Sequence, residues 1–151
     1  MSHCMTEHNP NTISDEEIVY RAVRDQLLLF LSDDTEQVRI SSMAFIDVNR
    51  RLSVDRARLC LNGPNETRDR FSPGSGVLSL KAGGIRGIKA THGVTGQEYT
   101  VDDEPVPLPE NEAHSEIFGR PPFDTDKVFD RKKQSLTRIS TIVIAPDHFA
   151  S

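Results

Sequence analysis

Hydrophobic and polar residues follow their most regular pattern over residues 39–61, where two apolar runs flank a polar tetrad at residues 48–51. Residues 38–47 are rich in strand-forming side chains that alternate along the chain, which predicts a strand. Residues 52–61 alternate in the same way, although Ser53 could also cap a helix there, and we favour a strand that turns helical near its end. The two runs together predict a β-hairpin that starts the core.

Helical spacing marks both ends of the chain. Over residues 14–32 the apolar side chains recur every three or four positions, and three acidic residues follow a capping hydroxyl, where they favour the helix dipole. A second helix is predicted over residues 125–143, with basic residues on its polar side. Its last part, residues 140–144, is β-branched and could be extended instead.

Shorter signals between these helices complete the predicted fold. Residues 102–111 contain three prolines and should form an acidic surface loop. We predict an α+β domain over residues 13–145, with a mostly antiparallel sheet of about four to five short strands covered by an N-terminal and a C-terminal helix. Residues 1–12 and 146–151 are predicted to be disordered tails. The shorter elements are strands at 77–80, 98–101 and 113–118, a helical turn at 66–71, and a helical turn or strand at 85–88.

The net charge is -5, but acidic and basic residues are distributed unevenly along the chain. Residues 1–38 carry about -6, residues 39–89 +6, residues 90–116 -7 and residues 117–151 +2. Thirteen of the eighteen basic residues are arginine, whose planar fork suits carboxylates and phosphates. Either the fold pairs these blocks internally, or the basic middle presents a face that binds anions.

Composition argues against several classes of protein. No apolar run approaches the roughly 20 residues that span a bilayer, and the N-terminus has neither the basic nor the apolar region of a secretory signal. We therefore expect a cytoplasmic protein with no membrane contact. Cys4 lies in the predicted tail and Cys60 in an apolar run, so both are expected to be reduced thiols.

His114 and Glu116 are the first candidate for chemistry. Alternation in a strand places both side chains on one face, where Glu116 can orient or charge the imidazole for proton transfer. The simpler interpretation is a hydrogen-bonded surface pair. A metal site that combines His92 and His114 with nearby carboxylates has no fixed ligand spacing, so no metal is predicted. The sequence also contains no nucleophile elbow, phosphate-binding loop or dinucleotide fingerprint, and no cofactor is predicted.

A set of arginines is the second candidate. A strand over residues 52–61 would place two of them on one face, and the preceding turn would add two more guanidinium groups. Such a cluster suits an acidic protein or a phosphate. Nucleic acid is the weaker possibility, because few aromatic residues lie nearby and the chain is acidic overall. The predicted anion- or partner-binding residues are Arg39, Arg50, Arg51, Arg56 and Arg58.

These features predict a small accessory or binding protein that contacts a protein partner in a larger assembly, through the arginine-rich strands or the acidic proline-rich loop. In style the chain is similar to small products of bacterial gene clusters, including antiviral defence and toxin–antitoxin sets, and this likeness rests on no particular residue. The alternative is a small enzyme on a phosphate-containing substrate, such as a nuclease or a nucleotidyl- or ADP-ribosyl-transferring enzyme. In that alternative Arg39, Arg56 and Arg58 hold phosphate, and His114 and Glu116 act as acid and base.

Overall fold

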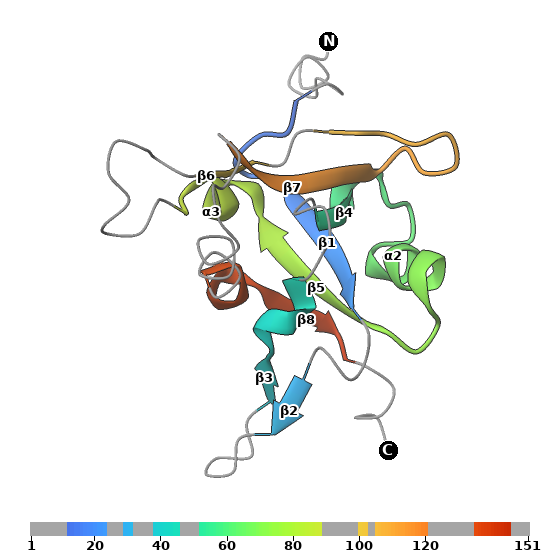
Figure 1. Ribbon diagram of the computed structural model, residues 1–151. Coiled ribbons are helices and arrows are strands. Elements are labelled where there is room, and N and C mark those ends of the chain that lie inside the picture. The colour runs from blue at the N-terminus through green and yellow to red at the C-terminus, as the bar shows by residue number, and fades with distance from the viewer. Residues whose placement is uncertain are drawn as a thin grey trace, which may run out of the picture.

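The fold is built on a six-stranded antiparallel sheet (Figure 1). Its strands are β1 (Ile18–Val23), β4 (Leu52–Arg56), β5 (Gly76–Lys81), β6 (Thr100–Asp102), β7 (His114–Arg120) and β8 (Thr141–Ile144). They lie in the order β6–β7–β4–β1–β5–β8. β2 (Leu29–Leu31) and β3 (Val38–Ile40) form a separate two-stranded ribbon. The computed structural model describes residues 12–23, 29–31, 38–45, 52–88, 100–102, 105–120 and 135–145.

Short helices connect and cover these strands, which confirms the predicted α+β class with an antiparallel sheet. The helices are the 3₁₀ turns η2 (Ser42–Phe45) and η3 (Ala57–Leu59) and the α-helices α2 (Pro64–Phe71) and α3 (Ala82–Arg86). Residues 135–139 are also helical. α3 decides the open choice at residues 85–88 in favour of a helical turn, and α2 is longer than the single turn that was predicted.

The predicted N-terminal helix is wrong, because its first half is the central strand β1. Val19 and Val23 are both buried, and a spacing of four residues fits one face of a strand as well as one face of a helix. β-Branched and aromatic side chains in this segment favour the strand. Pairing with β4 on one side and β5 on the other then fixes it. The N-terminal helix that was expected to cover the sheet is therefore not found.

The predicted hairpin over residues 39–61 is also wrong, although its two strands exist. β4 is followed by the 3₁₀ turn η3, which confirms the interpretation of residues 52–61 as a strand that turns helical. However, β3 pairs with β2, whereas β4 pairs with β1 and β7. The chain leaves the extended conformation at η2, which buries Ala44 and Phe45 in the core. This segment therefore packs into the core as a 3₁₀ turn and does not form the predicted strand pairing.

One face of the sheet carries the hydrophobic core. Side chains from β1, β4, β5 and β7 meet Phe45 of η2, Ile85 of α3 and Leu136 of the helix at residues 135–139. Leu136 packs the short helical segment at residues 135–139 against this cluster, but the expected covering of the sheet by a C-terminal helix is not confirmed. Residues 141–144 form strand β8, the extended alternative, paired with β5. Residues 125–134 of that predicted helix lie outside the described residues. The core cluster contains Val19, Val23, Ala44, Phe45, Leu52, Val54, Leu78, Leu80, Ile85, Ile88, Ile117 and Leu136.

α2 lies against the other face of the sheet, where it contacts β1, β5 and β8 (Figure 1). The helix begins directly after Gly63, whose φ is 67° and ψ -151°. Side chains other than glycine rarely adopt this conformation. Pro64 follows at the first helical position, where its missing N–H costs nothing and its fixed φ suits the helix. The Gly63-Pro64 pair therefore sets the point at which α2 starts.

Replacing Gly63 by alanine is expected to lower the free energy of unfolding by about 1–3 kcal/mol, because the new Cβ would be strained at this backbone conformation. Chemical denaturation followed by circular dichroism measures the change. Gly87→Ala is the matched control: its φ is -77°, and an added Cβ would meet nothing nearer than 3.4 Å. Equal losses in the two variants would contradict the assignment of strain to Gly63.

Candidate functional site

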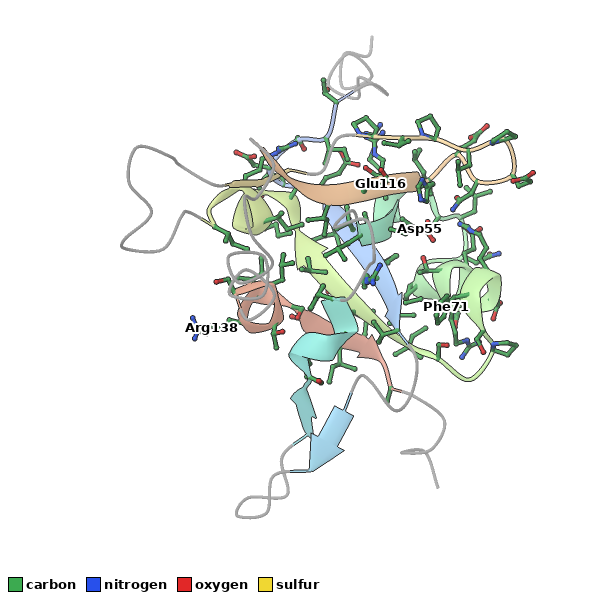
Figure 2. The ribbon with its side chains drawn as sticks, viewed as in Figure 1. Asp55, Phe71, Glu116 and Arg138 are labelled. Carbon is green, nitrogen blue, oxygen red and sulfur yellow. The ribbon has the colours of Figure 1, made fainter. Side chains whose placement is uncertain are left out.

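Four polar side chains share one face of β4 and β7. The register pairs Asp55 with His114 and Ser53 with Glu116, and residues that lie directly opposite each other in an antiparallel pair share a face. Buried Ser115 points to the core between His114 and Glu116. Figure 2 labels Asp55 and Glu116, which mark β4 and β7 on this surface. We call these four residues the β4–β7 polar face.

His114 is held between a loop and the neighbouring strand. Its Nδ1 lies 2.7 Å from the carbonyl oxygen of Val106, and its Nε2 lies 3.3 Å from the hydroxyl oxygen of Ser53. A carbonyl oxygen can only accept a hydrogen bond, so a neutral imidazole carries its proton on Nδ1. Nε2 is then an acceptor, and the Ser53 hydroxyl donates to it.

The acidic proline-rich segment that supplies Val106 folds back on itself. Leu108 and Asn111 exchange two backbone hydrogen bonds of 3.1 and 3.0 Å, which leaves Pro109 and Glu110 as the residues of a tight turn. Pro105 bridges Ser115 of β7. Proline is favoured at the second position of such turns because its φ is already set. The segment 105–113, which we call the proline hairpin, is therefore an ordered extension of β7.

The side chain of Asp55 links the proline hairpin to α2. Its two carboxylate oxygens accept hydrogen bonds from Thr67 Oγ1 at 2.7 Å and from Asn111 Nδ2 at 2.8 Å. Arg70 Nη2 lies 3.8 Å from the same carboxylate. Asp55 and Thr67 are both buried, so these bonds replace the water that a buried carboxylate loses. The carboxylate thus links β4 to α2 and to the proline hairpin, and its hydrogen bonds go to Thr67 and Asn111 although His114 lies across the strand pair.

Cys60 and Tyr20 lie close to this buried carboxylate. Burial raises the pKa of the Cys60 thiol, and the charge of Asp55 adds to the effect, while hydrogen bonding to Thr67 and the nearby Arg70 partly offset it. Burial also raises the pKa of the Tyr20 hydroxyl, with a smaller contribution from Cys60. A thiol held in its neutral form is a poor nucleophile. Cys60 is a free, buried thiol whose role is packing.

The raised pKa of Cys60 predicts a loss of stability in alkaline solution. Below the ordinary thiol pKa of 9.0 both the folded and unfolded forms are protonated, and the full stability is present. As the pH rises, the unfolded chain loses its proton before the folded chain does, so the folded form is increasingly disfavoured. Denaturation midpoints at about pH 8 and about pH 10 should therefore differ less in Cys60→Ala than in the unaltered protein. An unchanged difference would contradict this prediction.

The structure brings Arg56 and Arg58 together on an internal carboxylate. Arg56 donates from Nε and Nη2 to the two oxygens of Glu17, at 2.7 and 3.0 Å, and from Nη2 to the carbonyl of Thr12 at 3.1 Å. Arg58 Nε lies 3.5 Å from the same Glu17. Arg56 is 1% exposed. Pairing between the acidic N-terminal block and the basic block is thus observed at this position.

The other predicted arginines are not brought to this cluster by any described contact. Arg39 belongs to β3 and pairs with Phe30 of β2 through the backbone ribbon. Arg50 and Arg51 lie outside the described residues. Arg56 follows Asp55 in β4, so its side chain points to the face opposite His114. The predicted phosphate-binding residue Arg56 and the predicted acid–base pair therefore lie on opposite sides of the sheet.

Comparison of the chain with protein-family models, with curated proteins and with solved structures finds no match. Over the described ranges, no three His, Cys, Asp or Glu side chains gather in a way that could hold a metal ion. No helix in the same part of the chain is long and apolar enough to cross a membrane. The β4–β7 polar face and the proline hairpin are thus the features that carry the functional interpretation.

Sequence reasoning did not find Ser53, Asp55, Thr67 or Asn111 as parts of this site. Ser53 and Asp55 do alternate with the buried Leu52 and Val54, which marks them as belonging to the other face of a strand. Their partners come from segments 12 to 61 residues away. Strand register brings Ser53 next to His114, and side-chain hydrogen bonds bring Thr67 and Asn111 to Asp55. No local sequence pattern encodes either.

Proposed function

We propose that the protein is a binding or accessory protein that docks onto a protein partner through the proline hairpin. The single observation that carries this proposal is the tip of the hairpin, where Leu108 is 43% exposed beside the exposed acids Glu110 and Glu112. An apolar centre with a polar, charged rim is the arrangement of many contact surfaces. An accessory subunit of a bacterial defence or toxin–antitoxin assembly is one setting that suits this role.

The hairpin supports docking because it is already ordered in the free chain. Two backbone hydrogen bonds close the turn at Leu108 and Asn111, and the Asn111 side chain donates to Asp55. Prolines at 105, 107 and 109 further limit the conformations of the backbone. A segment held in its bound shape loses little conformational entropy on association, which favours binding.

The charge of this surface indicates the chemistry of the partner. The proline hairpin contains two acidic residues, Glu110 and Glu112, and no lysine or arginine. Leu61, which is 92% exposed, belongs to the turn before α2, on the same side of the molecule as the hairpin (Figure 1). We therefore propose a partner with a basic surface and a shallow apolar recess, which complementary charge would steer into place.

The arginine-rich alternative has less support from the described contacts. Arg56 is buried, and Glu17 and Thr12 already accept hydrogen bonds from its guanidinium. A phosphate would have to displace this internal carboxylate. The phosphate-dependent enzyme also needs Arg56 and His114 at one site, whereas they point to opposite faces of the sheet. The docking role is for these reasons the one that we propose.

Site-specific photo-crosslinking in the native cell tests the proposal. A benzophenone amino acid at position 108 should give a discrete adduct with a basic protein, because the tip enters the interface. The matched control is the same substitution at Arg138, an exposed position on the side of the molecule away from the hairpin (Figure 2). Glu110→Gln combined with Glu112→Gln should weaken the adduct at 108, because it removes the charge that attracts the partner.

Two outcomes would contradict the docking proposal. One is the absence of any adduct at position 108 under conditions that crosslink a known complex in the same cells. The other is the same set of adducts at positions 108 and 138, which would indicate collision without a specific surface. Thermal unfolding of each variant should be measured alongside the crosslinking, to check that the substituted protein is folded.

A further inference from the structure

We infer that Ser53 and His114 form a nucleophile–base pair, with the carbonyl of Val106 as the group that orients the base. This inference goes beyond the docking role and depends on different residues. Two contacts carry it: Nε2 of His114 lies 3.3 Å from the hydroxyl oxygen of Ser53, and Nδ1 of the same ring lies 2.7 Å from the carbonyl oxygen of Val106. A serine hydroxyl becomes a nucleophile when a base accepts its proton and a third group fixes the base.

The tautomer of His114 is the one that this chemistry needs. The 2.7 Å contact to Val106 places the proton of a neutral ring on Nδ1. Nε2 then presents its lone pair to Ser53 at 3.3 Å, a distance typical of such pairs before substrate binds. Val106 is held in turn, because its own N–H donates to the carbonyl of His114 at 3.3 Å. The proline hairpin thus acts as the positioning element for the base.

Ser53 is accessible although β4 lies in the interior of the sheet. Strands β7 and β1 flank β4 on its two edges, yet the side chain of Ser53 is exposed, while Leu52 and Val54 on either side of it are buried. A substrate can therefore approach Ser53 from the open side of the β4–β7 polar face. The nearby helix α2 is bound to Asp55 through Thr67 and leaves Ser53 uncovered.

A serine hydroxyl paired with a histidine base points to an ester as the substrate class, because these are the two groups that acyl transfer uses. Glu116 lies directly across the strand pair from Ser53 and borders the same open face. The buried Arg56 points to the other face and binds Glu17, so it does not reach a substrate at Ser53.

The step is an ordinary two-stage acyl transfer. Ser53 Oγ forms a bond to the carbonyl carbon of the ester while its proton passes to Nε2 of His114. The carbon–oxygen bond to the alcohol then breaks, and the imidazolium returns the proton to the departing alkoxide. Water attacks the acyl-serine in the second stage by the same route, releasing the acid and restoring both side chains.

Covalent labelling tests the inference on the full-length chain. Incubation with a fluorophosphonate probe should form a phosphorus–oxygen bond at Ser53 with loss of fluoride, and peptide mass spectrometry locates the adduct. Ser53→Ala should abolish labelling at this position. His114→Asn keeps a side-chain N–H for the Val106 carbonyl but removes the base, so labelling should slow by about 100-fold. Ser79→Ala is the matched control, because Ser79 shares this face on β5 and should not alter the rate.

Turnover with two chromogenic esters separates the substrate classes. The protein should release p-nitrophenol from p-nitrophenyl acetate in a Ser53-dependent manner and should not release it from p-nitrophenyl phosphate. Absence of an adduct at Ser53, or equal labelling of His114→Asn with matching thermal unfolding, would overturn the inference. Release from the phosphate ester alone would overturn the acyl assignment. None of these outcomes alters the crosslinking expected at position 108, so the two proposals fail separately.

Discussion

Arg56→Met is expected to lower the free energy of unfolding by about 3–5 kcal/mol, because it leaves the carboxylate of Glu17 buried without its main partner. The side chains of Arg56 and Glu17 are only 2% and 8% exposed. Arg56 also satisfies the carbonyl of Thr12, so its loss releases the segment that leads into β1. Urea denaturation followed by circular dichroism measures the change.

The double variant Arg56→Met with Glu17→Leu gives this prediction its control. Removing both charges should recover most of the lost stability, since an apolar pair of similar volume can replace a buried ion pair. Arg68→Ala is the surface comparison: its partner Asp69 is 64% exposed, and the change should stay within about 0.5 kcal/mol. Failure of the double variant to recover stability would show that the N-terminal segment depends on these side chains for more than charge.

Phe45→Ala is expected to cost about 3–5 kcal/mol, as large-to-small substitutions of buried aromatic residues do. Phe45 is fully buried in the core cluster, although it belongs to a 3₁₀ turn and not to a strand. The loss combines the transfer free energy of the ring with that of the cavity left behind. Denaturant midpoints give the change, and Phe45→Leu should recover part of it.

Phe71→Ala is the matched comparison for Phe45. Phe71 ends α2 and is 50% exposed, so its truncation should cost less than about 1 kcal/mol. Figure 2 labels its side chain on α2. Equal losses for the two phenylalanines would mean that η2 does not pack into the core as described.

The sequence predicted the class of the fold more reliably than its pairing. Alternation predicted strands over residues 52–61 and 113–118, which correspond to β4 and β7, and the short strand predicted at 77–80 corresponds to β5. A single helical turn was predicted at residues 66–71, whereas α2 begins at Pro64. β1 was missed because Val19 and Val23 are spaced by four residues, which satisfies both the helical and the strand period. The predicted hairpin over residues 39–61 is not formed because η2 interrupts the extended chain, and the burial of Ala44 and Phe45 accounts for that interruption.

The candidate site was also predicted only in part, because the strand face was predicted and the contacts between strands were not. The shared face of His114 and Glu116 follows from the two-residue repeat of a strand. The contact of His114 with Ser53 depends on the register between β7 and β4, and the tautomer depends on a carbonyl that the hairpin supplies. The predicted role of Arg56 and Arg58 in anion binding stays a prediction. Both contact the carboxylate of Glu17, which lies 39 residues before Arg56 in the sequence.

The strand order has a consequence for how the chain reaches this fold. Of the five pairings in the main sheet, only that of β6 with β7 joins strands adjacent in sequence. β1 pairs with β5, and β4 pairs with β7, although other segments lie between them in the sequence. Most of the sheet can therefore form only after distant parts of the chain come together. Such non-local topologies fold in milliseconds to seconds and not in microseconds. During synthesis β1 would leave the ribosome well before its partners, with both edges unpaired. Unpaired strand edges of this kind are open to wrong pairing until their partners are available.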